Sequence, residues 1–192
     1  MDTAETAPGT WRPGRAAAIV PTVVAALATL WATSVPGWDL LWLGLIANVW
    51  FCIGLVWLVT LVRMLLRRQS SAWFRGEWPV WSVPPLIVVL VCGLIYVNAP
   101  LEARFALSRP ALDDRARAVS HGTPLPVDTW VGLFPVEWAE RIPGGARFAI
   151  DGAGFLSTTG FAWSPEGEPP ESEGENLYQH WHGPWYLWSR GA

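Results

Sequence analysis

The stretch LLWLGLIANVWFCIGLVWLVTLV, from Leu40 to Val62, contains no charged side chain and decides the class of the fold. An α-helix rises about 1.5 Å per residue and the hydrocarbon core of a bilayer is about 30 Å thick, so about 20 apolar residues cross it. The stretch reaches this length. It therefore predicts a transmembrane helix.

Two further apolar runs flank this stretch, at Ala16–Ser34 and Val83–Ala99. The first contains Pro21, which is tolerated near the start of a helix. The third opens with Pro84–Pro85, and proline suits a first helical turn because its missing N–H has no partner there anyway. We therefore predict three transmembrane helices within residues 16–99.

Arginines flank the first two runs and predict the orientation of the chain. By the positive-inside rule, the tail 1–15 and the loop 63–80 lie in the cytoplasm, and everything beyond the third span lies outside. A second interpretation treats the first run, with Ala32-Thr-Ser34, as a cleaved signal peptide, which leaves two spans and an external tail. The basic residues that carry the orientation are Arg12, Arg15, Arg63, Arg67, Arg68 and Arg75.

The composition agrees with a membrane protein. Of 192 residues, 52% are hydrophobic and 15% are charged, and mean hydropathy is +0.27. Many of the 15 tryptophans lie at the ends of the apolar runs, where indole rings favour the membrane–water boundary. The net charge of −3 excludes nucleic-acid binding by bulk electrostatics.

The polar content of the apolar runs argues against transport, because no ionisable group lies within the core of a span. Asn48 is the main polar side chain at depth, and we expect it to hydrogen-bond a neighbouring helix. Cys52 and Cys92 lie near the middle of two runs and are expected to be two buried thiols rather than a disulfide. The tail contains no cysteine, which excludes a disulfide-stapled external domain.

The tail divides into a helical linker, 100–128, and a β-rich domain, 129–192. In the linker, Leu101–Ser108 continues the third helix, and Ser108 caps a second short helix up to Val119. In the domain, alternating apolar residues and glycine turns predict a β-meander of four or five strands. Its core is small, so we expect it to lean on the membrane helices, on a second copy or on a partner.

Apolar residues alternate with charged ones in the first strands of this domain. Val136, Trp138 and Ile142 alternate with Glu137 and Arg141, which predicts one apolar face. An acidic loop, 164–176, lies between the last strands, and its glutamates lack the spacing of a calcium site.

Three motifs of the tail carry chemical hypotheses. On a strand, His180 and His182 share a face and could hold one zinc ion, although no third ligand is evident. Asp151, Ser157 and His180 could form a hydrolytic triad only if the fold brought them together. The glycines of Gly152–Ser157 lack the third glycine and the helix of a dinucleotide fingerprint.

Two segments, GFLSTTGFAWSP at Gly154–Pro165 and GPWYLW at Gly183–Trp188, resemble the tails of uncharacterised small integral membrane proteins of actinobacteria. The resemblance covers about a third of the chain. It implies no activity, because none is attached to that group. It agrees with a composition in which every basic residue other than histidine is arginine.

The sequence therefore predicts a plasma-membrane protein with three transmembrane helices and a small C-terminal extracytoplasmic β-rich domain. We expect a non-enzymatic interaction or accessory module with no assigned cofactor, metal or catalytic residue. Its partners would be the lipid bilayer and an envelope protein or larger membrane complex, and homo-oligomerisation stays open. The alternatives are a ligand or metal sensor using His180 and His182, and a membrane-bound hydrolase or transferase.

Overall fold

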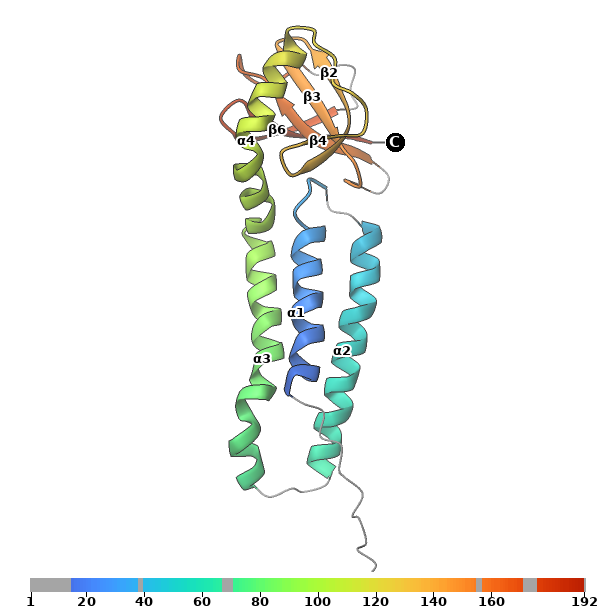
Figure 1. The fold of residues 1–192 in the computed structure, drawn as a ribbon, viewed down its shortest axis with the longest axis vertical. Helices are drawn as coiled ribbons and strands as arrows, with labels where there is room; N and C mark the ends of the chain where they lie inside the picture. The colour runs from blue at the N-terminus through green and yellow to red at the C-terminus, as the bar shows by residue number, and fades with distance from the viewer. Residues whose placement is uncertain (1–14, 38–39, 67–70, 155–156, 171–175, 192) are drawn as a thin grey trace, which may run out of the picture.

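The computed structural model describes residues 15–37, 40–66, 71–154, 157–170 and 176–191. Helices α1 to α3 lie side by side, and α4 continues from α3 along a curled sheet at one end of them (Figure 1). The helices are α1 (Arg15–Ala32), α2 (Leu40–Leu66), α3 (Ser71–Tyr96) and α4 (Ala99–Ser120). The strands are β1 (Thr129–Val131), β2 (Phe134–Ile142), β3 (Gly145–Ile150), β4 (Ser157–Trp163), β5 (Asn176–His182) and β6 (Trp185–Gly191).

Several predictions concern residues outside those described. These residues are the predicted cytoplasmic tail up to residue 14, the loop arginines Arg67 and Arg68, and the acidic-loop residues Glu171, Glu173 and Glu175.

Helix α1 packs against both α2 and α3 (Figure 1). Small side chains of α1, including Thr22, Ala25 and Thr29, are buried in these contacts. Small residues let helix backbones approach closely, which is how helices associate in a membrane. Trp50 of α2 adds a polar contact, because its Nε1 donates to Oγ1 of Thr29 at 2.9 Å.

Among the described residues, α2 is the one helix that is by itself long and apolar enough to cross a membrane, over Leu41–Arg63. The apolar part of α1, Ile19–Ala32, is shorter, and Ser82–Tyr96 passes the same test only jointly with α4, across a bend of 57°. The structure thus supports one candidate span, and the three predicted spans are not shown. The helices still expose many large apolar side chains, such as Phe51 (70% exposed) and Leu86 (67%).

Helix α3 differs from the prediction at its start. It begins at Ser71 and continues through Pro84–Pro85, which therefore do not occupy a first turn. The predicted loop 63–80 is correspondingly shorter, since α2 reaches Leu66. Proline inside a helix removes one backbone hydrogen bond at its position.

The break between α3 and α4 lies at Val97–Asn98, not at Ser108 as predicted. Asn98 adopts a left-handed conformation (φ 53°, ψ 22°), which asparagine tolerates better than most residues. Helix α4 then runs without interruption to Ser120. Ser108 lies inside it and donates from Oγ to the carbonyl of Arg104 at 2.8 Å, so it is not a cap.

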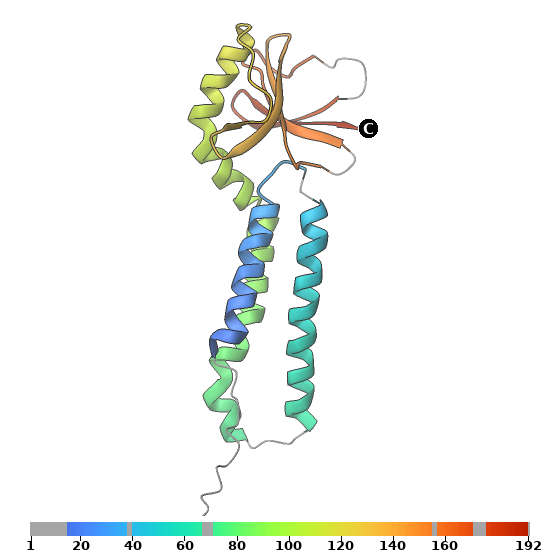
Figure 2. The same cartoon turned by 45° about the vertical axis from the view of Figure 1, so that its right-hand side comes forward.

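The six strands form one antiparallel sheet in the order β1-β2-β3-β4-β6-β5, and α4 covers one of its faces (Figure 2). The predicted meander of four or five strands is wrong at its end, because β4 pairs with β6 and β5 lies outside β6 at the edge. The acidic segment thus joins β4 to an edge strand.

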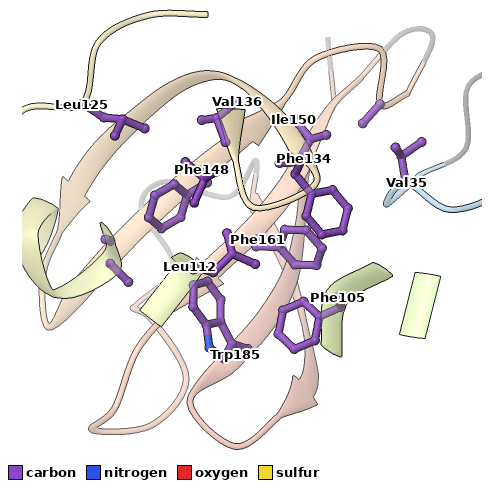
Figure 3. Close-up of a cluster of buried hydrophobic side chains, with 14 of the residues drawn as sticks. Val35, Phe105, Leu112, Leu125, Phe134, Val136, Phe148, Ile150, Phe161 and Trp185 are labelled. Atoms are coloured by element: carbon purple, nitrogen blue, oxygen red, sulfur yellow. The ribbon is translucent and has the colours of Figure 1, made fainter. Parts of the chain in front are cut away.

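The main core lies between α4 and the sheet (Figure 3). In β2, a register shift against β3 lies between Val136 and Trp138. Because of this bulge, Val136 belongs to the main core, whereas Trp138 packs against Trp188 on the opposite face. The predicted single apolar face of β2 is therefore wrong. The labelled core residues are Val35, Phe105, Leu112, Leu125, Phe134, Val136, Phe148, Ile150, Phe161 and Trp185.

Candidate functional site

The turn after α1 enters the core of the β domain. Ser34, Val35 and Pro36 are buried, and Val35 belongs to the same cluster as Phe134 and Phe161. This contact agrees with the expectation that so small a domain leans on the helices. A strand also holds the turn, since Thr159 Oγ1 of β4 donates to the carbonyl of Pro36 at 2.7 Å.

Gly37 permits this close approach. Its φ of +79° is a conformation that L side chains rarely adopt, and a Cβ built on it would lie 2.7 Å from Oγ1 of Thr159. The turn therefore depends on glycine for two independent reasons, its backbone conformation and the contact with β4.

Arg104 of α4 links three parts of the chain at this junction. Its Nε and Nη2 donate to the carbonyl of Leu133, at 3.1 and 2.6 Å, and Nη1 donates to Oγ of Ser34 at 2.8 Å. The guanidinium also lies over the rings of Trp31 (4.5 Å) and Phe134 (4.8 Å). The end of α1, the β1–β2 turn and α4 are thus tied together by one side chain, which is 6% exposed.

The charge of Arg104 has an unusual environment. Among the described residues it forms no ion pair with a carboxylate. Burial lowers its pKa from the usual value by desolvation, although an arginine stays charged at neutral pH. Carbonyl and hydroxyl oxygens, two aromatic faces and the negative end of the α1 dipole stabilise the cation in place of a counter-ion.

A second buried arginine, Arg147, lies on the sheet face away from α4. It donates from Nε to Oε1 of Glu140 (2.8 Å) and from Nη1 to Oδ1 of Asn176 (2.9 Å), and its guanidinium lies 4.5 Å from the Trp188 ring. Asn176 belongs to β5 and Glu140 to β2, so the curl of the sheet brings distant strands together. These contacts use most of the donors of Arg147, which indicates a role in packing.

The two tail histidines do not form the expected shared face. A register shift lies between them, so His180 contacts the Tyr186 ring while His182 stacks on Phe105 of α4. His182 Nε2 also pairs with Oε2 of Glu102 at 2.7 Å. Across the described residues, no group of three or more histidine, cysteine or carboxylate side chains could hold a metal ion.

The three residues of the hydrolase hypothesis are not brought together. Ser157 pairs with Gly191 at one end of β6, whereas His180 pairs with Tyr186 five residues away, which is about 16 Å along a strand. The ring of His180 instead contacts the carbonyl of Gly183 through Nε2 at 3.0 Å. This spacing gives no nucleophile–base pair of the predicted kind.

An apolar groove lies between α2 and α3. Trp50 and Trp57 of α2 and Pro84 and Pro85 of α3 line it. None of these side chains can act as a nucleophile or a base, so the groove suits lipid chains better than a reaction. The junction around Arg104, which was not predicted, is the polar site that ties the helices to the sheet.

Comparisons with protein-family models, with curated proteins and with solved structures find no match to this chain.

Proposed function

We propose that the chain is a plasma-membrane protein whose helices α1, α2 and α3 span the bilayer and hold the β domain on the outer side as a non-enzymatic interaction module. The exposed apolar side chains of these helices support the placement, because a face so rich in Leu, Val and Phe is unfavourable in water and suits lipid. The tryptophans near the helix ends agree with it.

The positions of the arginines support the orientation. Arg63 lies in the last turn of α2, at the end of the helices remote from the sheet (Figure 1). The tail and loop arginines adjoin the same end in the sequence. Under the positive-inside rule this end is cytoplasmic, so the β domain is extracytoplasmic.

The contacts of α1 favour a first helix that stays in the mature protein. Cleavage after Ser34 would remove the partner of Arg104 Nη1 and separate Val35 from the helix that delivers it. It would also remove Thr29, which accepts the Trp50 hydrogen bond.

The observation that carries the proposed function is the junction itself. Arg104, Val35 and Thr159 join the helices and the sheet, so the β domain is held at the membrane in one orientation. A fixed orientation suits a module that presents a surface to an envelope protein or a larger membrane complex.

Strand β5 is the part of the domain best suited to such contact. It has a neighbouring strand on one side only, and an unpaired strand edge can add a strand from a partner. The other edge strand, β1, has 3 residues against 7 in β5. Leu177 of β5 is 73% exposed and would lie in such an interface.

Site-specific photo-crosslinking in intact cells tests this function. A photoreactive residue at Leu177 should yield a discrete adduct with an envelope protein. The matched control is Leu107 on the outer side of α4, which is 74% exposed and should yield none. Equal labelling at both positions, or no adduct at Leu177, would contradict an interaction surface at β5.

A further inference from the structure

Two faces of α2 show a heptad-like spacing, and only one of them is used within the chain. The inner face packs toward α1 and α3 and includes Ile46, Trp50 and Ile53. The outer face is exposed throughout, and we call it the α2 seam. Steps of four and three residues define its members: Leu41, Leu45, Asn48, Cys52, Leu55, Val59 and Val62.

Exposure of the apolar seam residues is unremarkable for a helix in lipid, because lipid tails solvate Leu and Val as well as another helix does. Asn48 is different. It lies seven residues from Leu41, or about 10 Å into the hydrocarbon. Within the described chain its amide makes one hydrogen bond, from Nδ2 to the carbonyl of Gly44 at 2.8 Å. The Oδ1 acceptor and one N–H of Asn48 have no partner among the described residues, and with α2 in the bilayer, as proposed above, they face hydrocarbon.

The expected hydrogen bond from Asn48 to a neighbouring helix is not found among the described residues of this chain. Asn48 is exposed on α2, and Trp50 makes the polar contact to α1 instead. An unsatisfied amide in hydrocarbon is costly, so a group from outside the chain has to satisfy it.

We propose that the α2 seam is the interface of a parallel homodimer in which the two Asn48 amides hydrogen-bond each other. This proposal rests on the membrane placement of α2 made above. A second copy fits for two reasons. An amide is a donor and an acceptor at once, so two copies satisfy one another reciprocally, and one insertion orientation puts both Asn48 residues at the same depth.

The seam has the pattern that such a pair needs. Apolar residues at steps of three and four pack as knobs into holes, and one asparagine in the series selects the partner and its register. Gly44, one turn before Asn48, has no side chain to keep two helices apart, and the space around it is free of other parts of the described chain, since a built Cβ meets nothing within 4 Å.

Cys52 provides a direct test, because it lies in the seam one turn after Asn48, whereas Cys92 lies on α3. The full-length protein in native membranes is treated with copper phenanthroline. Two Cys52 thiols then lose two protons and pass two electrons to this oxidant, forming one intermolecular disulfide. The expected product is a reducible species of twice the monomer mass that persists in Cys92→Ala and disappears in Cys52→Ala.

Two further variants separate the seam from random collision. In the Cys92→Ala background, the additional substitution Asn48→Ala should lower the apparent association constant of the dimer by about tenfold. In a Cys52→Ala/Cys92→Ala background, Leu45→Cys should cross-link and Val49→Cys, exposed but outside the seam, should not.

Three results would overturn the homodimer. They are absence of the Cys52 product, equal yields from Leu45→Cys and Val49→Cys, and a Cys52 adduct of another mass, which would indicate a different partner. If the protein stays in the membrane after alkaline washing, such a result leaves the proposed membrane placement intact. If alkaline washing releases the protein, both proposals fail.

Discussion

The guanidinium of Arg104 donates a hydrogen bond from Nη1 to Oγ of Ser34 over 2.8 Å, although 70 positions of sequence separate the two residues. The same side chain donates twice to the carbonyl of Leu133. The end of α1 and the β1–β2 turn are therefore both hydrogen-bonded to the guanidinium of Arg104. Because of this link, the helices and the β domain should respond together when the junction is altered.

Replacing Arg104 should loosen this junction. Arg104→Met leaves the Leu133 carbonyl and Ser34 without their donor, and a buried group that loses its partner costs about 1–3 kcal/mol of unfolding free energy. Urea unfolding of the protein in nanodiscs, followed by tryptophan fluorescence, measures the loss. Arg115→Met, at an exposed position of the same helix, is the control and should change little. Equal losses in the two variants would contradict a special role for Arg104.

Gly37→Ala should destabilise the same junction by a different route. The added Cβ would meet Thr159 at 2.7 Å, in addition to the strain of a positive φ. Gly122→Ala carries a similar strain, at φ +90°, but its Cβ meets nothing within 4 Å. The difference between the two variants in thermal unfolding isolates the contact with Thr159, and we expect Gly37→Ala to lose about 1–3 kcal/mol more. No difference would argue against the contact.

The sheet face away from α4 should depend on Arg147. Arg147→Ala removes the contacts with Glu140, Asn176 and the Trp188 ring and leaves a cavity, so we expect a loss of at least about 2 kcal/mol. Arg141→Ala, in the exposed part of β2, is the control and should change stability by less than about 0.5 kcal/mol. Chemical unfolding measures the stability of both variants. Equal stability of Arg147→Ala and Arg141→Ala would contradict a packing role for Arg147.

Zinc should not stabilise the protein through the tail histidines. The register shift separates His180 from His182, and the two rings contact Tyr186 and Phe105 instead of converging. Thermal unfolding with and without Zn²⁺ should therefore show no shift that His180→Ala abolishes. A shift lost in both His180→Ala and His182→Ala would revive the metal-sensor hypothesis.

Local patterns predicted part of this architecture. The uncharged run from Leu40 identified α2, and the glycine turns identified a β-rich domain, because these features depend on residues near one another in the sequence. The junction could not be predicted in this way. Arg104 resembled any charged residue on a helix, and its role depends on contacts with Ser34 and Leu133 far away in the chain.

The errors have related causes. Ser108 resembles a helix cap in sequence, but the helix break lies at Asn98 instead. An asparagine in the left-handed conformation cannot be recognised from the neighbouring residues alone, so the break was not predicted there. The predicted single apolar face of β2 was wrong because of a β-bulge, which is visible only in the pairing of β2 with β3. Strand β5 lies at the edge because β4 pairs with β6. This pairing joins strands that are not consecutive in the sequence, so local patterns do not predict it.

Protease accessibility of a C-terminal tag tests whether the β domain lies on the extracytoplasmic side of the membrane. The tag is exposed to protease in intact cells and then after lysis, with a cytosolic protein as the control for leakage. With the β domain outside the cell, we expect the tag to be cleaved in intact cells. Protection until lysis would contradict it and would place the β domain, with its partners, in the cytoplasm.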